Sequence, residues 1–336
     1  MKKDNAFPAK NIACLAFLIF VAASSPPAFA QEVLRVSYPA PDAGYIPLWA
    51  AKEAGLFDKN NVKVELVYIA STPVGMAALM AGEINVITGA AGVVLSANLS
   101  GASDLVLFSG LAKTLPFSFY SKPSVSEPSQ IKGKKIGVTR FGSTIDFAAR
   151  WVLSRWHLDP KKDVVLLQIG SIPNILAALK TNAVDAGVLS FPMSLMARKS
   201  GFKELADIGA MGMKYQKEAF GARRGFLEKN RETMRRFVAG LIEGIHYVKT
   251  HPEEAMAITK KYTKIEDREI LKEAYEILVQ KHLPRVPTVS PEHLTLILED
   301  LGERNPKART TPPEKFIFDQ YVRDVVDAGL VEKLYR

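Results

Sequence analysis

The sequence STPVGMAAL at residues 71–79 returns one hundred positions later as SIPNILAAL at residues 171–179. Each copy predicts a helix, because Ser is a favoured residue before a helix and Pro in the first turn sacrifices no needed donor. Each copy runs on to a short alternating segment, Ile84-Asn85-Val86 or Val184-Asp185-Ala186, which predicts a strand. The two copies therefore indicate the same helix–strand unit twice.

The correspondence extends backwards from both copies. Residues 34–38 match 135–139 as a strand, residues 45–54 match 144–156 as a helix, and residues 62–67 match 164–168 as a second strand. Each half is thus a βαβαβ unit, and a period of about a hundred residues is too long for a solenoid repeat. We expect an α/β fold with two similar lobes facing each other across a cleft, where a small molecule binds.

The N-terminus has the pattern of a secretory signal peptide. Three lysines precede an apolar run at residues 12–23, and Ala28 and Ala30 occupy the small-residue positions of a cleavage site. The alternative, a single membrane anchor, is disfavoured because the run is too short for a hydrocarbon core of about 30 Å. We expect a secreted protein whose signal peptide, residues 1–30, is cleaved after Ala30.

Composition excludes several classes of protein. The net charge is +9, or about +7 without the predicted signal peptide, but the lysines and arginines alternate with acidic residues on helices, so no nucleic-acid surface is indicated. The sole cysteine, Cys14, lies inside the signal peptide. The mature chain therefore has no disulfide framework, no cysteine-ligated zinc and no cysteine nucleophile.

A polar, proline-punctuated segment at residues 121–129 separates the two halves, and the pattern becomes helical after residue 223. Helices are expected at residues 227–250, 252–262, 265–282, 291–301 and 314–328. Since these helices bring no sheet, we expect them to pack on the first lobe. Lobe 1 would then be discontinuous, residues 31–122 plus 223–336, and lobe 2 would be residues 123–222. The second crossover would lie near residues 215–222, and two crossovers would form a hinge.

Several stretches resemble a known family. GLFDKN (55–60), VKVEL (62–66) and ALMAGEINV (78–86) resemble the first lobe of the nitrate/sulfonate/taurine class of ABC-transporter substrate-binding proteins, in the superfamily named after thiamine-pyrimidine biosynthesis proteins (NMT1/THI5-like). IKGKKIGV (131–138) and GSTIDF (142–147) are similar to the second lobe, and residues 219–230 to the return into the helical part. The resemblance implies a periplasmic, monomeric binding protein of type II-like fold with two crossovers. It would close on its ligand and deliver it to an inner-membrane ABC permease driven by an ATPase.

Ligands of open α/β sheets bind beyond the carboxyl ends of the strands, and this rule selects five loops here. The candidate ligand-binding residues are Asp42 and Tyr45 in the first loop, Ser71 and Thr72 in the second, Gly89 and Ala90 in the third, Arg140, Phe141, Gly142, Ser143 and Thr144 in the fourth, and Ser190 and Phe191 in the fifth. The fifth loop mirrors the third and could close an aromatic lid over a pocket with apolar walls.

The fourth loop is the strongest candidate, because Gly-Ser-Thr at a helix start presents amides, hydroxyls and a positive dipole end to an oxyanion. Its alternative interpretation is a capping box between Ser143 and Asp146, which uses only some of these donors. Arg140 is either a counter-ion or a surface residue, and Asp42 either a helix cap or a ligand contact. Tyr45 either stacks on a ligand or packs on the next loop.

Catalytic motifs are missing from the sequence. It has no Gly-x-Ser-x-Gly, no Gly-x-x-x-x-Gly-Lys and no His-Glu-x-x-His, and its five histidines follow no metal-ligand spacing. We expect no metal, no cofactor and no enzymatic activity. Two alternatives stay open: an enzyme on the same fold, and a ligand sensor that docks on a membrane receptor. The sequence does not separate the sensor from the importer component.

Overall fold

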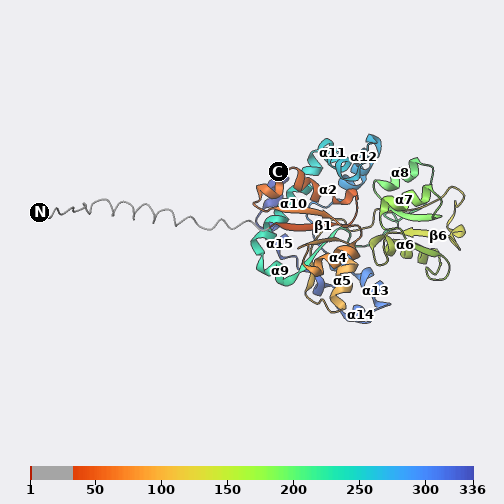
Figure 1. Ribbon diagram of the computed structural model, residues 1–336, viewed down its shortest axis with the longest axis horizontal. Coiled ribbons are helices and arrows are strands. Elements are labelled where there is room, and N and C mark those ends of the chain that lie inside the picture. The colour runs from red at the N-terminus through yellow and green to blue at the C-terminus, as the bar shows by residue number, and fades with distance from the viewer. Residues whose placement is uncertain (2–32) are drawn as a thin grey trace. The chain divides into compact units, whose positions relative to one another are not determined.

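The computed structural model describes Met1 and residues 33–336, and the latter form one compact unit. The predicted signal peptide and its cleavage after Ala30 lie outside the described residues. Within the described part of the chain, no helix is both long and apolar enough to span a bilayer. The described residues form a two-stranded, a three-stranded and a five-stranded sheet, and helices cover them (Figure 1). A parallel bridge joins the two smaller sheets, which we together call the first sheet, and the five-stranded sheet is the second.

The first sheet has the spatial order β2-β1-β3-β10-β4. Its strands are β1 (Leu34–Tyr38), β2 (Val64–Tyr68), β3 (Ile87–Gly89), β4 (Leu105–Gly110) and β10 (Ala219–Arg223). β1 and β2 run parallel, and the parallel bridge Val36–Val86 joins β1 to the chain just before β3. β10 runs antiparallel between β3 and β4. The helices of this half are the 3₁₀-helix η1 (Ala43–Tyr45), α2 (Ile46–Glu53), α3 (Leu56–Lys59), α4 (Thr72–Ala81) and α5 (Ala91–Leu99).

The second sheet has the order β7-β6-β8-β5-β9. Its strands are β5 (Phe117–Ser121), β6 (Lys135–Val138), β7 (Val165–Gln168), β8 (Ala186–Ser190) and β9 (Lys203–Asp207). β6 is parallel to β7 and β8, whereas β5 is antiparallel between β8 and β9. The helices are η2 (Pro128–Ile131), α6 (Thr144–Arg155), α7 (Ile172–Lys180) and α8 (Met193–Lys199), seen in green in Figure 1.

The two sheets confirm the predicted repeat. β1-α2-β2-α4-β3 and β6-α6-β7-α7-β8 have the same order, the same parallel pairings and the same central strand. Each sheet is completed by one antiparallel strand that follows a crossover. The two-lobed α/β architecture expected from the sequence is therefore present.

The predicted lobe boundaries were wrong by one strand on each side. β5 was assigned to the first lobe, but it pairs with β8 and β9 in the second sheet, and β10 was assigned to the second lobe, but it lies between β3 and β4. The crossing segments are therefore residues 111–116 and 208–218. Residues 121–129 connect two strands of the same sheet, and the Ser121 hydroxyl is bonded there to the Val125 carbonyl (2.5 Å). We use lobe 1 for residues 33–110 plus 219–336 and lobe 2 for residues 117–207.

The C-terminal part is helical and packs on lobe 1, as expected. It comprises α9 (Arg224–Lys229), α10 (Arg231–Thr250), α11 (Pro252–Thr263), α12 (Arg268–Tyr275), the π-helix η3 (Glu276–His282), η4 (Pro291–His293), α13 (Thr295–Gly302), α14 (Lys307–Thr310), η5 (Pro313–Phe316), α15 (Gln320–Asp327) and α16 (Leu330–Leu334). α10 packs on α2, where a Cβ at Gly244 would lie 2.4 Å from the Pro47 carbonyl oxygen. α13 packs on α5 (Figure 1).

Candidate ligand-binding site

A small cavity of about 40 Å³ lies between the lobes, where the carboxyl ends of the strands lead into helices. Its lining residues are Pro39, Ala40, Asp42, Tyr45, Ser71, Thr72, Phe117, Thr139, Ser143, Thr144, Ile145, Ile172 and Lys217. Six of the thirteen predicted site residues belong to this set: Asp42, Tyr45, Ser71, Thr72, Ser143 and Thr144.

Three helix N-termini meet at this cavity. α4 begins at Thr72, α6 at Thr144 and α7 at Ile172, and each of these residues lines the cavity. The first amides of a helix have no partner inside the helix and carry a partial positive charge. Their convergence from both lobes makes the cavity suited to a negatively charged group.

Ser71 departs from its expected role. Its backbone has φ 72° and ψ 142°, so its side chain makes no capping bond with α4. The hydroxyl is buried and has no hydrogen-bond partner in the described structure. A non-glycine residue at such a φ costs on the order of 1–3 kcal/mol, and such strain concentrates at functional sites. The prediction that Ser71 caps its helix was wrong, whereas Ser171 does cap α7 through the Asn174 amide (3.4 Å).

Gly89 and Ala90 do not line the cavity but position Thr72. The Ala90 amide donates to Thr72 Oγ1 at 3.1 Å. Gly89 has φ 135°, and a Cβ there would lie 2.2 Å from the same oxygen. A side chain at position 89 would therefore push Thr72 out of place.

The fourth loop forms the predicted cap, and two of its residues, Ser143 and Thr144, line the cavity. Ser143 Oγ accepts from the Asp146 amide (3.2 Å), which is the expected cap. It also accepts from the Thr139 hydroxyl (2.7 Å), which leaves the Ser143 hydrogen available to a ligand. Thr144, the first residue of α6, also lines the cavity. Burial raises the pKa of Tyr215, a residue of the second crossover.

A buried charge cluster forms the lobe 1 side of the cavity. Lys217 Nζ lies 3.2 Å and 3.1 Å from the two carboxylate oxygens of Asp42, and it also contacts Glu218. Asp42 accepts from the Gly44 amide (2.7 Å), so it is a helix cap as well as a cavity residue. Burial, reinforced by Asp42, raises the pKa of Glu218 to about 7 although Lys217 opposes the shift. Burial alone would lower the pKa of Lys217, but the two carboxylates raise it.

Sequence reasoning missed Lys217 and Glu218. Both lie in the segment that it assigned to the end of lobe 2, and neither follows a strand of the repeat. The available signal was a Lys-Glu pair directly before the apolar strand β10, where charged residues become buried. Tyr45, predicted as a contact, lines the cavity and is buried, and burial raises the pKa of its hydroxyl.

The other predicted residues lie outside the small cavity. Arg140 is exposed. Phe141 and Gly142 line a second cavity, described below. Ser190 is buried at the end of β8, and the Phe191 carbonyl accepts from the Ala43 amide (3.1 Å) of lobe 1. Phe191 thus makes a backbone contact between the lobes, which helps to hold the observed arrangement, and the aromatic lid stays a prediction.

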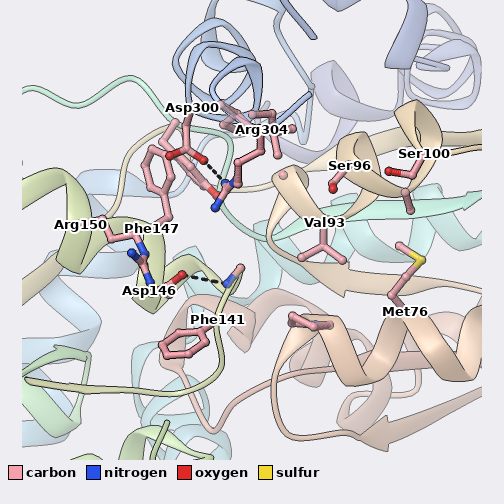
Figure 2. A pocket seen from close by; sticks show the side chains of 17 residues that line it. Met76, Val93, Ser96, Ser100, Phe141, Asp146, Phe147, Arg150, Asp300 and Arg304 are labelled. Carbon is pink, nitrogen blue, oxygen red and sulfur yellow. Dashed lines mark hydrogen bonds and ion pairs between the residues drawn. The ribbon is translucent and has the colours of Figure 1, made fainter. Parts of the chain in front are cut away.

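The second cavity has a volume of about 430 Å³ and lies between α4 and α5 of lobe 1, α6 of lobe 2, and α13 (Figure 2). Two ion pairs lie at its edge, Asp146–Arg150 (2.8 Å) and Asp300–Arg304 (2.6 Å). Burial raises the pKa of Asp300. Within the described residues, no three or more His, Cys, Asp or Glu side chains are grouped so that they could hold a metal ion.

Two lobes joined by two crossovers, with a cavity where helix N-termini from both lobes converge, define the class of two-lobed α/β binding proteins. Residues 34–263 match the NMT1-like family, and this chain belongs to that family. YtlA of Bacillus subtilis strain 168 is 23% identical over 239 residues, which cover 70% of this chain and 72% of YtlA.

Solved structures share the fold. The alkanesulfonate-binding protein SsuA of Xanthomonas axonopodis pv. citri, bound to MOPS, superposes with a TM-score of 0.72 at 17% identity, covering 85% of this chain and 98% of SsuA. The periplasmic nitrate-binding protein NrtA of Synechocystis PCC 6803 gives a TM-score of 0.71 at 14% identity, covering 89% of each chain. These neighbours have the periplasmic binding protein fold, as the sequence predicted.

Proposed function

We propose that this protein is the extracytoplasmic solute-binding component of an ABC importer and captures a small anionic solute between its lobes. The buried, unpartnered hydroxyl of Ser71, at a cavity where three helix N-termini meet, is the observation that carries the proposal. An unsatisfied buried donor costs about 1–3 kcal/mol unless something binds it. A ligand oxygen would satisfy it.

Because the charges at the cavity are already balanced, the helix termini and the hydroxyls are the main hydrogen-bond donors to an anion. Lys217 is the one cationic side chain among the described residues that line the cavity, and two carboxylates already share it. Uncharged donors therefore carry the recognition. SsuA is an alkanesulfonate-binding protein and NrtA a nitrate-binding protein, and both support an anionic ligand for this chain.

Contacts that join the lobes support closure about the two crossovers. In addition to the Ala43–Phe191 backbone bond, α8 of lobe 2 pairs with α12: Arg198 with Glu273 at 2.5 Å, and Lys199 with Asp267. These contacts would form as the lobes approach and break as they separate. We also propose that the protein is monomeric and periplasmic, that its signal peptide is cleaved after Ala30, and that it delivers its solute to a permease and ATPase.

The alternative of an enzyme on this fold has no positive observation in its favour. Glu218, the buried carboxyl with a pKa of about 7, lies behind Lys217 and does not line the cavity. We therefore propose binding without turnover. Unchanged test anions recovered after prolonged incubation would agree with this, and a converted product would contradict it.

The test is calorimetric titration with nitrate, methanesulfonate and taurine, using tetramethylammonium as a cationic control of similar size. We expect at least one of the anions to bind with a Kd below about 1 mM, and the cation to show no binding. The radius of gyration measured by X-ray scattering should fall with the bound anion. Binding of the cation alone, or of none of the anions, would reject the proposal.

A further inference from the structure

Two buried carboxylates share one buried ammonium group beside the first cavity. Asp42, Lys217 and Glu218 are exposed by only 2%, 4% and 0%. When all three groups are ionised, the cluster has one negative charge more than it has positive charges. A buried charge that no partner offsets is costly, because the protein interior solvates it poorly. The cluster therefore favours the binding of a proton.

Glu218 is the carboxyl group of this cluster with the weaker support. Asp42 accepts hydrogen bonds from the Gly44 amide (2.7 Å) and from Lys217 Nζ (3.2 Å). In the part of the chain that the structure describes, neither oxygen of the Glu218 carboxyl has a hydrogen-bond partner, and its contact with Lys217 is an ion pair. A Cβ at Gly44 would lie 2.2 Å from Glu218 Oε1, so this carboxyl packs directly against the backbone of η1. Glu218 is therefore the group that takes the proton.

Four titratable groups face Glu218: Lys217 on its own crossover, Asp42 and Tyr45 from the first loop and η1, and His282 from η3. His282 and Glu218 border a void of about 10 Å³, which is about the space of one water molecule. Burial lowers the pKa of His282, so its imidazole is neutral near pH 7 and gives Glu218 no second cation. Burial raises the pKa of Tyr45, so its phenol is neutral as well.

The cluster lies where the hinge meets the first cavity. The Lys217 amide donates to the Ala112 carbonyl at 2.9 Å. The Leu111 amide donates to the Glu218 carbonyl at 3.3 Å, so the two crossovers are joined beside the cluster. Lys217 lines the cavity, and its Nζ lies 4.9 Å from the centre of the Phe117 ring in lobe 2. The charge of Glu218 therefore acts on the hinge and on the one ammonium group that faces a ligand.

We propose that this cluster is a proton-binding site and that the capture of an anion in the first cavity is coupled to the uptake of a proton by Glu218. The inference rests on the proposed function and adds its regulation. An anion next to Lys217 disfavours the ionised carboxylate behind it, because like charges repel in a buried site. The solvent supplies the proton, and the neutral carboxyl then leaves Lys217 to be shared with Asp42 alone. Proton and anion therefore strengthen each other's binding.

This coupling fixes the direction of the pH dependence. Below the pKa of Glu218 in the free protein, about 7, the free and the bound protein both hold the proton, and affinity is highest. As the pH rises through this value, the free protein loses the proton that the complex retains, so affinity falls. Affinity levels off once the complex has lost the proton as well. We expect a total loss of about tenfold.

Calorimetric titration with methanesulfonate from about pH 5.5 to about pH 9 tests the coupling. Methanesulfonate is the anion of a strong acid and does not itself titrate in this range, and nitrate replaces it if it does not bind. The buffers are bis-Tris, imidazole and Tris, which are not anions and do not compete for the site. Their different ionisation enthalpies report the number of protons taken up. We expect about half a proton per anion near pH 7.5 and almost none near pH 5.5.

Two variants assign the proton. Glu218→Gln keeps the shape of the side chain but cannot titrate, so affinity should become independent of pH and proton uptake should disappear. His282→Gln removes the other titratable group at the void and should retain both effects. Glu218→Met also removes the charge and replaces Glu218→Gln if that variant does not fold. The proton count in the unaltered protein needs no variant.

The outcomes separate this inference from the proposed function. Affinity that is independent of pH in the unaltered protein, or proton uptake that persists without Glu218, overturns the inference and leaves anion binding standing. Proton uptake that disappears in His282→Gln alone would assign the proton to His282 and overturn it as well. If methanesulfonate, nitrate and taurine all fail to bind at every pH, the proposed function fails and this inference fails with it.

Discussion

The start of α4 and the start of α7 have nearly the same sequence but different structures. Ser171 has extended backbone, φ −136°, and its hydroxyl caps α7, whereas Ser71 has φ 72° and its hydroxyl is left without a partner. On the lobe 1 side the neighbouring Lys217, Asp42 and Glu218 are also buried. At the start of α7 the serine hydroxyl stabilises its helix. At the start of α4 the serine hydroxyl stabilises nothing in the described structure, and it is left as a donor for a ligand.

The largest expected effect comes from removing the buried cation on the lobe 1 side. Lys217→Met leaves two buried carboxylates without a cationic partner, so the free energy of unfolding should fall by about 3–5 kcal/mol. Urea unfolding measures it. Lys180→Met, at the exposed end of α7, should change stability by less than about 0.5 kcal/mol. Equal losses of stability in the two variants would show that the buried Lys217 contributes no more to stability than an exposed lysine.

Stability should depend on pH through Glu218. Its pKa is raised to about 7 in the folded protein, and its ordinary value is 4.5. The folded state therefore binds the proton more tightly, so this contribution is complete below pH about 4.5 and is lost as the pH rises to about 7, by on the order of 3 kcal/mol. Glu218→Gln should flatten the dependence between pH 5 and 7. An unchanged slope in the variant would assign the dependence to other groups.

The lobe 2 side should contribute to affinity through its hydroxyls. Replacing Ser143 and Thr144 together by Ala removes two donors and leaves the backbone amides, so affinity for methanesulfonate should fall by about ten- to a hundredfold, or roughly 1.5–3 kcal/mol. Loss of the cap would separately lower stability by about 1 kcal/mol. Lower stability with unchanged affinity would make this turn purely structural and restrict recognition to lobe 1.

The smallest expected effect concerns support for Thr72. Gly89→Ala forces a side chain into φ 135° and against Thr72 Oγ1, so we expect a loss of stability of about 1–2 kcal/mol together with weaker anion binding. Ser190→Ala, at the equivalent end of β8, removes a hydroxyl without backbone strain and should cost less than about 1 kcal/mol. Thermal unfolding and titration of both variants compare the two sides.

The repeat made the fold predictable because hydrophobic patterning and turn residues are local properties of the sequence. It predicted both βαβαβ units and the loops that hold Ser71, Thr72, Ser143 and Thr144. It failed for β5 and β10, because whether a strand following a crossover pairs in one sheet or the other depends on distant partners.

Sequence reasoning missed some site residues for the same reason, because their positions depend on partners that are distant in the sequence. Lys217, with Glu218 next to it, reaches the cavity through a crossover, and no sequence pattern around it marks this segment as part of the site. The free hydroxyl of Ser71 depends on a backbone angle that the sequence does not specify, and its equivalent, Ser171, supported the wrong role. The repeat therefore predicts the common scaffold, whereas Lys217 and the backbone of Ser71 lie where the two halves depart from it.

The central claim is that the Ser71 hydroxyl binds the ligand, whereas the Ser171 hydroxyl caps α7. It is tested most directly by titrating methanesulfonate into Ser71→Ala and Ser171→Ala. We predict that Ser71→Ala weakens binding at least about tenfold without lowering the unfolding temperature of the free protein. Ser171→Ala should leave affinity unchanged and lower the free energy of unfolding by about 1 kcal/mol. Unchanged affinity in Ser71→Ala, or equal losses of affinity in both variants, would contradict the account.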